Sequence, residues 1–349
     1  MFHIAHWWKR WYSDPHTVNL FAILFLSFFA IYFFGHLITP LLVAIVLAYL
    51  LERPISSLVK RGFSRLPAVL VIFLFFVSFM LIAFFGLLPT TWKQVGNLVN
   101  DIPNMYSQLH HTISKLPQRY PELASLEIVD AVIDNAKNQV LSVGEKILKG
   151  SFASIISLVT ITVYLFLVPL MTFLLLKDKD RILVGLNKAM PKNRELVEKV
   201  WAEVNQKISN YINGKIFEIA IVGSVSYATF TFFRLHYSIL LAVAVGFSVL
   251  IPYIGAALVT VPVAMVGLFQ WGLVGEFYWM MATYGVIQIL DGNILVPVLF
   301  SEAVNLHPVS IITAVLFFGG LWGFWGVFFA IPLGALVKAV WQALLKGRP

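Results

Sequence analysis

Long apolar runs alternate with short polar stretches along the chain, and the lengths of these runs predict membrane-spanning helices. The run at 18–35 and the run at 67–88 are each close to the ~20 residues that a helix needs to cross the hydrocarbon core. The shorter run at 38–51 leaves open whether its helix crosses completely. We predict an all-α, polytopic membrane protein with about seven or eight transmembrane helices and several shorter, broken or re-entrant helices.

Composition agrees with this prediction. Of the 349 residues, 59% are hydrophobic and only 12% are charged, whereas a soluble domain carries about 25% charged residues. The lipid bilayer is therefore the expected partner of most of the surface. The chain has no cysteine, which excludes disulfides and thiolate metal sites. We expect no metal site and no cofactor.

The net charge of +8 is best explained by membrane topology. Basic residues lie between the apolar runs, as they do in cytoplasmic loops, and no basic stripe interleaves with stacking aromatics, so nucleic-acid binding is not expected. Segment 177–215 has nine Lys/Arg and five Asp/Glu. The runs at 18–35 and 38–51 have basic flanks, so this pair is predicted to leave the cytoplasm and return. Both termini are predicted to be cytoplasmic.

The same patterns divide the chain into six parts. Segment 89–150 has six basic and six acidic residues, and this neutrality is typical of an extracytoplasmic module. Val200, Val204 and Tyr211 belong to one apolar helical stripe in a basic segment, which predicts an amphipathic helix. The predicted parts are an interfacial segment 1–17, transmembrane helices 18–88, an extracytoplasmic helical module 89–150, a transmembrane helix 151–176, a cytoplasmic amphipathic helical segment 177–215, and a C-terminal transmembrane core 216–349.

Prolines and glycines interrupt the apolar segments of this C-terminal core, and the interruptions follow a weak repeat. Leu235-His236 matches Leu306-His307 after 71 positions, and Gly255 matches Gly326 after the same interval. The apolar background could also produce these matches by chance. The span count between the units 236–270 and 306–340 predicts that they are inverted relative to each other, as in many secondary transporters.

One polar cluster stands out in the apolar core. Asp291 is one of three charged residues between Arg234 and Lys338, and an ionisable group within the bilayer is a functional candidate because its insertion costs at least ~2.5–3.5 kcal/mol. A simpler alternative is that Asp291-Gly292 ends a helix in a turn and that His307-Pro308 starts one. The candidate transport and ion-coupling residues are Asp291, Gln288, Asn293, Glu302, Asn305 and His307.

A second group of residues is expected to break helices. Pro252 removes a backbone donor and so frees a carbonyl group, and Gly255 permits a tight turn. Such exposed carbonyls can coordinate cations or polar substrate groups, although a plain re-entrant hairpin tip would need the same residues. The candidate broken-helix hinges are Pro252, Tyr253, Gly255, Gly292, Pro297 and Pro308.

Enzyme signatures are missing from the chain. It contains no nucleotide-binding P-loop, no H-E-x-x-H zinc motif and no G-x-S-x-G nucleophile motif. We therefore expect a protein that is not an enzyme and whose transport would be driven by an ion gradient. A passive channel and a non-transporting membrane scaffold are the alternatives.

Three long motifs resemble the autoinducer-2 exporter (AI-2E) family of bacterial permeases: FSVLIPYIGA (247–256), DGNILVPVLFSEAVNLHP (291–308) and FGGLWGFWGVFFAIPL (318–333). The resemblance covers nearly the whole chain. It implies a multi-pass protein of the inner membrane that forms a homo-oligomer, a pentamer in the family's pattern. The family's motifs fall on Pro252 and Gly255, and on Asp291, Asn293, Pro297, Leu306, His307 and Pro308.

Some members of this family export a quorum-sensing signal and others exchange sodium for protons, so the substrate does not transfer with the resemblance. The resulting hypothesis is a permease that uses an ion gradient either to export a small solute or to exchange a cation for protons. Asp291 would bind the coupling H⁺ or Na⁺, with Gln288, Asn293 and Glu302 as polar partners.

Overall fold

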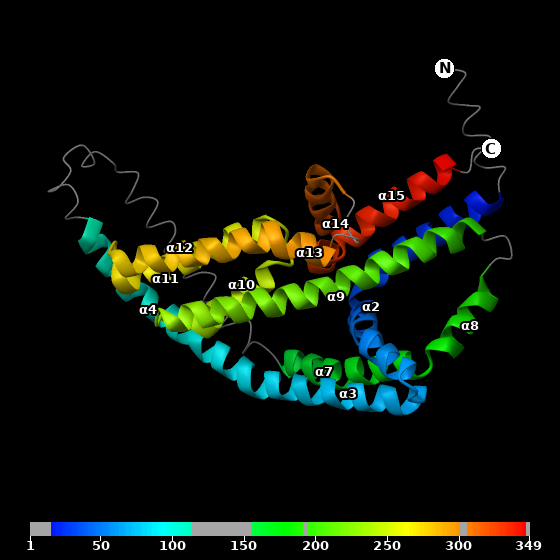
Figure 1. Ribbon diagram of the computed structural model, residues 1–349, viewed down its shortest axis with the longest axis horizontal. Helices are drawn as coiled ribbons and strands as arrows, with labels where there is room; N and C mark the ends of the chain where they lie inside the picture. The colour runs from blue at the N-terminus through cyan, green and yellow to red at the C-terminus, as the bar shows by residue number, and fades with distance from the viewer. Residues whose placement is uncertain (1–14, 114–154, 191–194, 301–305, 347–349) are drawn as a thin grey trace, which may run out of the picture.

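The computed structural model describes residues 15–113, 155–190, 195–300 and 306–346, and this part of the chain contains helices but no strand (Figure 1). Seven of its helices are long and apolar enough to cross a membrane. The prediction of an all-α polytopic membrane protein is therefore confirmed. Most of segment 1–17, residues 114–150 of the predicted extracytoplasmic module, and both Glu302 and Asn305 lie outside the described residues.

The first two apolar runs form one helix, α2 (Pro15–Lys60), which includes Pro40 and Pro54. The sequence predicted two separate helices here. A membrane helix tolerates an internal proline because neighbouring groups satisfy the freed backbone. The two halves of α2 run in different directions in Figure 1, so the helix is continuous but bent.

The next span also continues further than predicted. Helix α3 (Arg65–Ile82) passes through a π-helical turn, η1 (Ala83–Leu87), into α4 (Leu88–Ile113) without a break. The predicted extracytoplasmic module therefore begins inside a continuous helix, because a π-turn absorbs an extra residue without ending the helix. The side chain of Gln94 on α4 accepts a hydrogen bond from the Leu240 amide at 2.8 Å. Helix α4 thus braces the C-terminal core.

Helices α7 (Ile155–Lys177) and α8 (Lys179–Ala189) lead to α9 (Glu195–Phe232), the long helix through the middle of Figure 1. The predicted amphipathic segment and the span after it share this one helix, so no helix boundary exists at 215/216. The predicted apolar stripe is confirmed: Val200 and Val204 are buried against Leu20 of α2 and Ala339.

The C-terminal core consists of short and long helices, several of which pack along α9. They are α10 (Ser238–Ser248), α11 (Ile254–Trp271), α12 (Gly275–Leu290), the π-turn η3 (Asp291–Leu295), α13 (Val296–Phe300), α14 (Pro308–Phe328) and α15 (Ala330–Lys346). Val222 of α9 shares an apolar cluster with Val245 of α10, Val263 of α11 and Tyr284 of α12.

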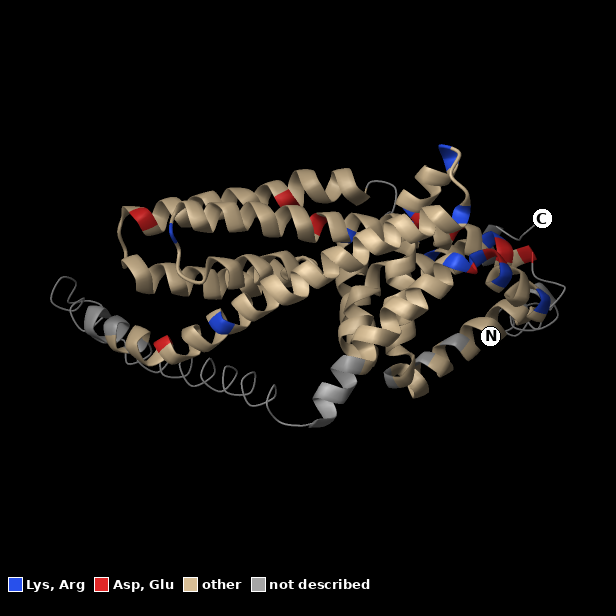
Figure 2. Ribbon diagram, turned by 90° about the horizontal axis from the view of Figure 1, so that it is seen from below, with Lys and Arg blue, Asp and Glu red and all other residues tan. Residues whose placement is uncertain are grey.

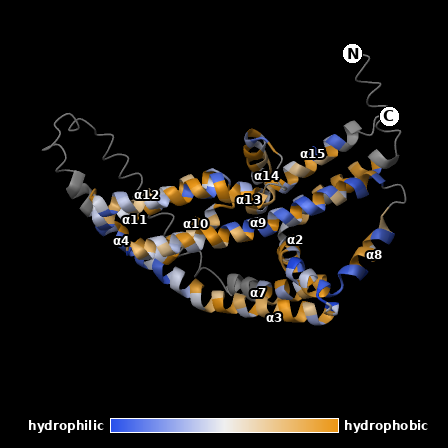
Figure 3. Cartoon of the chain, viewed as in Figure 1, coloured by the Kyte–Doolittle hydropathy of each residue, from blue (hydrophilic) through white to orange (hydrophobic). Residues whose placement is uncertain are grey.

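Apolar side chains also cover much of the outside. Phe75 is 74% exposed and Phe85 is 69% exposed, and hydrophobic positions colour the outer faces of the long helices in Figure 3. Most charged residues gather at one end of the molecule (Figure 2). This distribution is that of a multi-pass membrane protein, with lipid around the long helices and water at the ends.

Candidate functional site

The helices of the core break where Pro252 and Gly255 predicted. Helix α10 ends at Ser248, α11 begins at Ile254, and Tyr253 between them has a φ of +62°. A Cβ atom on Gly255 would stand 1.8 Å from the Ser248 carbonyl oxygen. Only glycine allows this close approach of the backbone.

A similar break occurs in the second predicted unit. Gly323, 70 positions after Tyr253, has a φ of +57° and interrupts α14 with a kink. A Cβ atom on Gly326 would stand 1.8 Å from the Phe318 carbonyl oxygen. This is the same distance as that between a Cβ atom on Gly255 and the Ser248 carbonyl oxygen. The spacing of the sequence repeat therefore coincides with matching backbone features. The inversion of the two units remains a prediction.

Asp291 lies in a helix rather than in a turn. It begins η3, and the helical backbone continues through α13 to Phe300. The alternative that Asp291-Gly292 ends a helix in a turn is therefore wrong. Single π-turns inside α-helices occur frequently at functional sites, which makes Asp291 a stronger candidate.

The predicted polar partners of Asp291 are engaged elsewhere. The side-chain amide of Gln288 donates to the Tyr284 hydroxyl at 2.8 Å, and that of Asn293 donates to the Ile289 carbonyl at 2.9 Å. Oδ1 of Asp291 is buried and has no hydrogen-bond partner among the described residues. The structure thus places these residues on one stretch of helix without joining them in a network.

The remaining predicted residues lie at helix starts or on the surface. His307 caps α14: its Nδ1 accepts from the Val309 amide at 3.3 Å, and Pro308 is the first residue of the helix. This agrees with the alternative reading of His307-Pro308 as a helix start, and Pro at that position needs no donor. Gly292 and Pro297 are exposed on η3 and α13. Their prediction as helix-breaking hinges is wrong, because the helix continues through both residues to Phe300.

A buried ion pair on α9 was missed by the sequence analysis. Nζ of Lys215 lies 2.7 Å from Oε2 of Glu218, and the two side chains are only 4% and 2% exposed. The same ammonium group donates to the Val249 carbonyl at 2.6 Å. Val249 directly follows α10, so Lys215 also neutralises the partial negative charge at the end of that helix.

Phe300 covers this ion pair from another helix. Its ring centroid lies 5.2 Å from Nζ of Lys215, within the range of a cation–π contact. A Cβ atom on Gly214 would be 2.7 Å from the ring of Phe300. The glycine next to Lys215 therefore makes room for the aromatic ring that shields the lysine.

Tyr211, one turn before Lys215, binds the other broken unit. Its hydroxyl donates to the Phe328 carbonyl at the end of α14, at 2.9 Å, and the bond is buried. Two residues four positions apart on α9 thus hold one backbone carbonyl from each unit. Helix α9 connects the two breaks directly.

Asp291 completes a set of three charges. It is half-buried and begins η3, which packs against α9, the helix that carries Lys215 and Glu218. We call Lys215, Glu218 and Asp291 the buried charge set. Two carboxylates and one ammonium group leave a net charge of −1 when all are ionised. A proton or a monovalent cation would neutralise that charge, so the set could take up such an ion.

Comparison with known proteins places the chain among transport proteins. Residues 21–346 match the family model described as "AI-2E family transporter". The chain is 51% identical to "Putative permease PerM" of Escherichia coli (strain K12) over 345 residues, which are 99% of this chain and 98% of that protein. It is 25% identical to "Putative transport protein YueF" of Bacillus subtilis (strain 168) over 321 residues, 90% of this chain and 86% of that protein.

Proposed function

Because the chain belongs to the AI-2E transporter family, we propose that it is a permease in which the buried charge set couples transport to a proton or sodium gradient. The net charge of −1 carries this proposal, since Lys215 and Glu218 are buried and Asp291 is half-buried. An unpaired carboxylate at that depth is costly, so binding of H⁺ or Na⁺ at Asp291 or Glu218 stabilises the site.

The surroundings of the charge set suit alternating access. Lys215 bonds the end of α10, and Tyr211 on the same helix face bonds the end of α14. Protonation of Glu218 would weaken its ion pair with Lys215. The hydrogen bond from Lys215 to the Val249 carbonyl would weaken as a consequence. Ion binding is thereby linked to the position of a broken helix, which is how discontinuous helices contribute to transport.

In this proposal the protein lies in the bacterial inner membrane with both termini in the cytoplasm. The end of the molecule that carries most Lys and Arg (Figure 2) would face the cytoplasm, as the positive-inside rule requires. The transported species is either a small solute that moves with the coupling ion or the cation itself. A homo-oligomer remains a prediction from the family resemblance.

Proton flux in liposomes tests the proposal. The purified protein would be reconstituted with an internal pH dye, and Na⁺ or K⁺ gradients would then be imposed. We expect a cation-dependent proton flux that falls to the rate of protein-free liposomes in Asp291→Asn and Glu218→Gln. Both changes remove a charge but keep the shape of the side chain.

Glu276→Gln is the matched control, because Glu276 is exposed in the first turn of α12. It should keep wild-type flux. Equal flux in Asp291→Asn and wild type would contradict a coupling role for Asp291 and would favour the passive-channel alternative. A wild-type protein that moves neither ions nor protons would contradict cation/proton exchange and leave solute export or a scaffold.

A further inference from the structure

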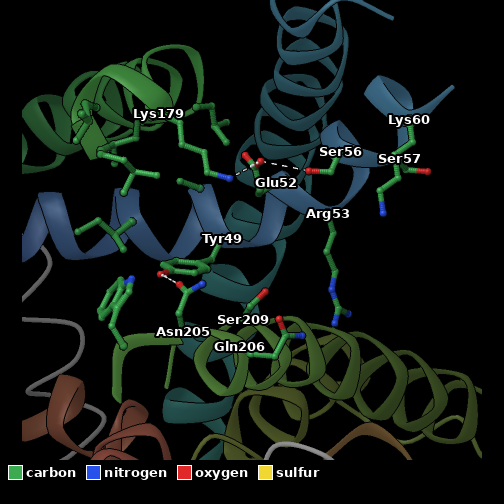
Figure 4. Close-up of a pocket in the computed structure, with 17 residues that line it drawn as sticks. Tyr49, Glu52, Arg53, Ser56, Ser57, Lys60, Lys179, Asn205, Gln206 and Ser209 are labelled. Carbon is green, nitrogen blue, oxygen red and sulfur yellow. Dashed lines mark hydrogen bonds and ion pairs between the residues drawn. The ribbon is translucent and has the colours of Figure 1, made fainter. Parts of the chain in front are cut away.

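A second polar site lies at the junction of α2, α7, α8 and α9. It is a cavity of about 530 Å³ and shares no residue with the buried charge set. Figure 4 shows polar side chains of α2 facing those of α9 across it. This cavity, which we call the α2–α9 pocket, has no part in the proposed ion coupling.

The α2 side of the pocket changes in character along the helix. Its lining residues recur at helical spacing on one face, from Ile45 and Ala48 through Arg53 and Ser57 to Lys60 at the helix end. The first positions are apolar and the last are polar or cationic. A ligand that follows this face would therefore have an apolar part and an anionic part.

The other walls add apolar side chains. Leu175 and Leu183 line the pocket from α7 and α8, and Trp201 lines it from α9. Trp201 is 54% exposed, and tryptophan favours the boundary between hydrocarbon and headgroups. Its mixed lining of apolar, cationic and tryptophan side chains is the kind that suits the boundary between acyl chains and headgroups.

The charges in the pocket leave a surplus of positive charge. Its carboxylate, Glu52, is already paired with Lys179 at 2.8 Å and with Arg65 at 3.2 Å. Arg53 uses Nη2 to donate to Asn210 at 2.6 Å. Lys60 makes no hydrogen bond or ion pair with any described residue. Arg53 and Lys60 are therefore positioned to receive an anion.

We propose that the α2–α9 pocket binds an anionic phospholipid, with its headgroup phosphate between Arg53 and Lys60 and an acyl chain along Ile45 and Leu183. Basic pockets between transmembrane helices bind anionic headgroups in this way. A free phosphate compound would fit the cationic end but would leave the apolar end unfilled. This proposal does not depend on ion coupling at Asp291.

Lipid retention by the full-length protein tests the proposal. The protein would be purified from nanodiscs of phosphatidylglycerol and phosphatidylcholine, and the bound lipid would be measured by native mass spectrometry. We expect bound phosphatidylglycerol in the wild type and about fivefold weaker binding in Lys60→Gln. Arg53→Gln should weaken binding by a similar factor.

Arg61→Gln is the matched control, because Arg61 is exposed next to Lys60 but does not line the pocket. It changes the net charge equally and should retain wild-type amounts of phosphatidylglycerol. Equal losses in Lys60→Gln and Arg61→Gln would overturn the proposal, since attraction would then be a property of the whole basic surface. Displacement of the lipid by inorganic phosphate would overturn the lipid assignment in favour of a soluble phosphate ligand.

Discussion

Two Lys–Glu pairs in this protein have the same chemistry and opposite surroundings. In the buried charge set, Lys215 and Glu218 are 4% and 2% exposed. In the α2–α9 pocket, Lys179 and Glu52 are 40% and 22% exposed. Water can screen the second pair but not the first, so the free energy of each pair depends on different terms.

This difference matches the two proposed roles. The buried pair shares its charge set with Asp291, and Lys215 also bonds a backbone carbonyl, so a single proton changes the balance of the whole set. In the pocket, Glu52 has two cationic partners, and its charge is compensated twice. Such a site can attract an anion, and the binding of one proton or one cation would change its charge balance little.

The largest expected difference in stability is between the variants in which each ion pair loses its lysine. Lys215→Met leaves Glu218 buried beside Asp291 without a cation, which should lower the free energy of unfolding by about 3–5 kcal/mol. Lys179→Met leaves Glu52 paired with Arg65 and should cost about 1 kcal/mol or less. Denaturation in mixed micelles of sodium dodecyl sulfate and a mild detergent would measure both values.

A double variant separates the lost charge from lost packing. Lys215→Met with Glu218→Gln removes both members of the pair, and it should recover part of the stability because the uncompensated carboxylate is gone. Equal destabilisation by Lys215→Met and Lys179→Met would show that burial does not distinguish the two pairs. It would also remove the main argument for the buried charge set.

An alanine at one glycine in each region should give the next largest effect. Gly255→Ala puts a Cβ atom 1.8 Å from the Ser248 oxygen, and overpacking of this kind costs about 1–3 kcal/mol or more. Gly185 in α8 has no atom within 4 Å of an added Cβ. Gly185→Ala should therefore stabilise the protein by about 0.5–1 kcal/mol, as alanine does inside a helix.

The same denaturation assay would measure this pair of variants. A stable Gly255→Ala protein would mean that the break at 249–253 can relax, and the contact between Lys215 and Val249 would then be adjustable rather than fixed. Destabilisation by Gly185→Ala would mean that α8 packs more closely than its open surroundings indicate.

The sequence analysis predicted one helix break correctly because proline and glycine act locally there, but it also expected breaks at Gly292 and Pro297, where the helix continues. Pro252 and Gly255 mark the first break. It failed where tertiary contacts decide the outcome: Pro40 does not end α2, and the π-turn at 83–87 carries α3 into α4. The length of an apolar run indicates whether a helix can cross the membrane, but not whether neighbouring runs form one continuous helix.

Asp291 was found because it is an isolated charge in an apolar context, whereas Lys215 was missed because it ends a basic segment. Counting charge over 177–215 assigned Lys215 to the cytoplasm. A usable signal was present: Lys215 and Glu218 are three positions apart on the face that continues from Tyr211 to Val222. Following the apolar face of one helix would have placed the pair inside, and summing charge by segment could not.

The smallest predicted contrast concerns one tyrosine hydroxyl in each region. The hydroxyl of Tyr211 bonds the Phe328 carbonyl in a buried position, and that of Tyr49 bonds the half-buried side chain of Asn205 beside the pocket. Tyr211→Phe leaves a buried carbonyl unsatisfied and should cost about 1 kcal/mol. Tyr49→Phe should cost less, because water can replace its hydroxyl at Asn205.

Flux measurements on the same two variants would show whether stability and transport respond together. If Tyr211 holds α14 to the helix that carries the charge set, Tyr211→Phe should alter the cation-dependent proton flux, while Tyr49→Phe leaves it at the wild-type rate. An equal response of flux to both changes would mean that the bond to Phe328 only supports the fold. The hydrogen bond between Tyr211 of α9 and Phe328 of α14 would then have no role in coupling, even if Asp291 and Glu218 have one.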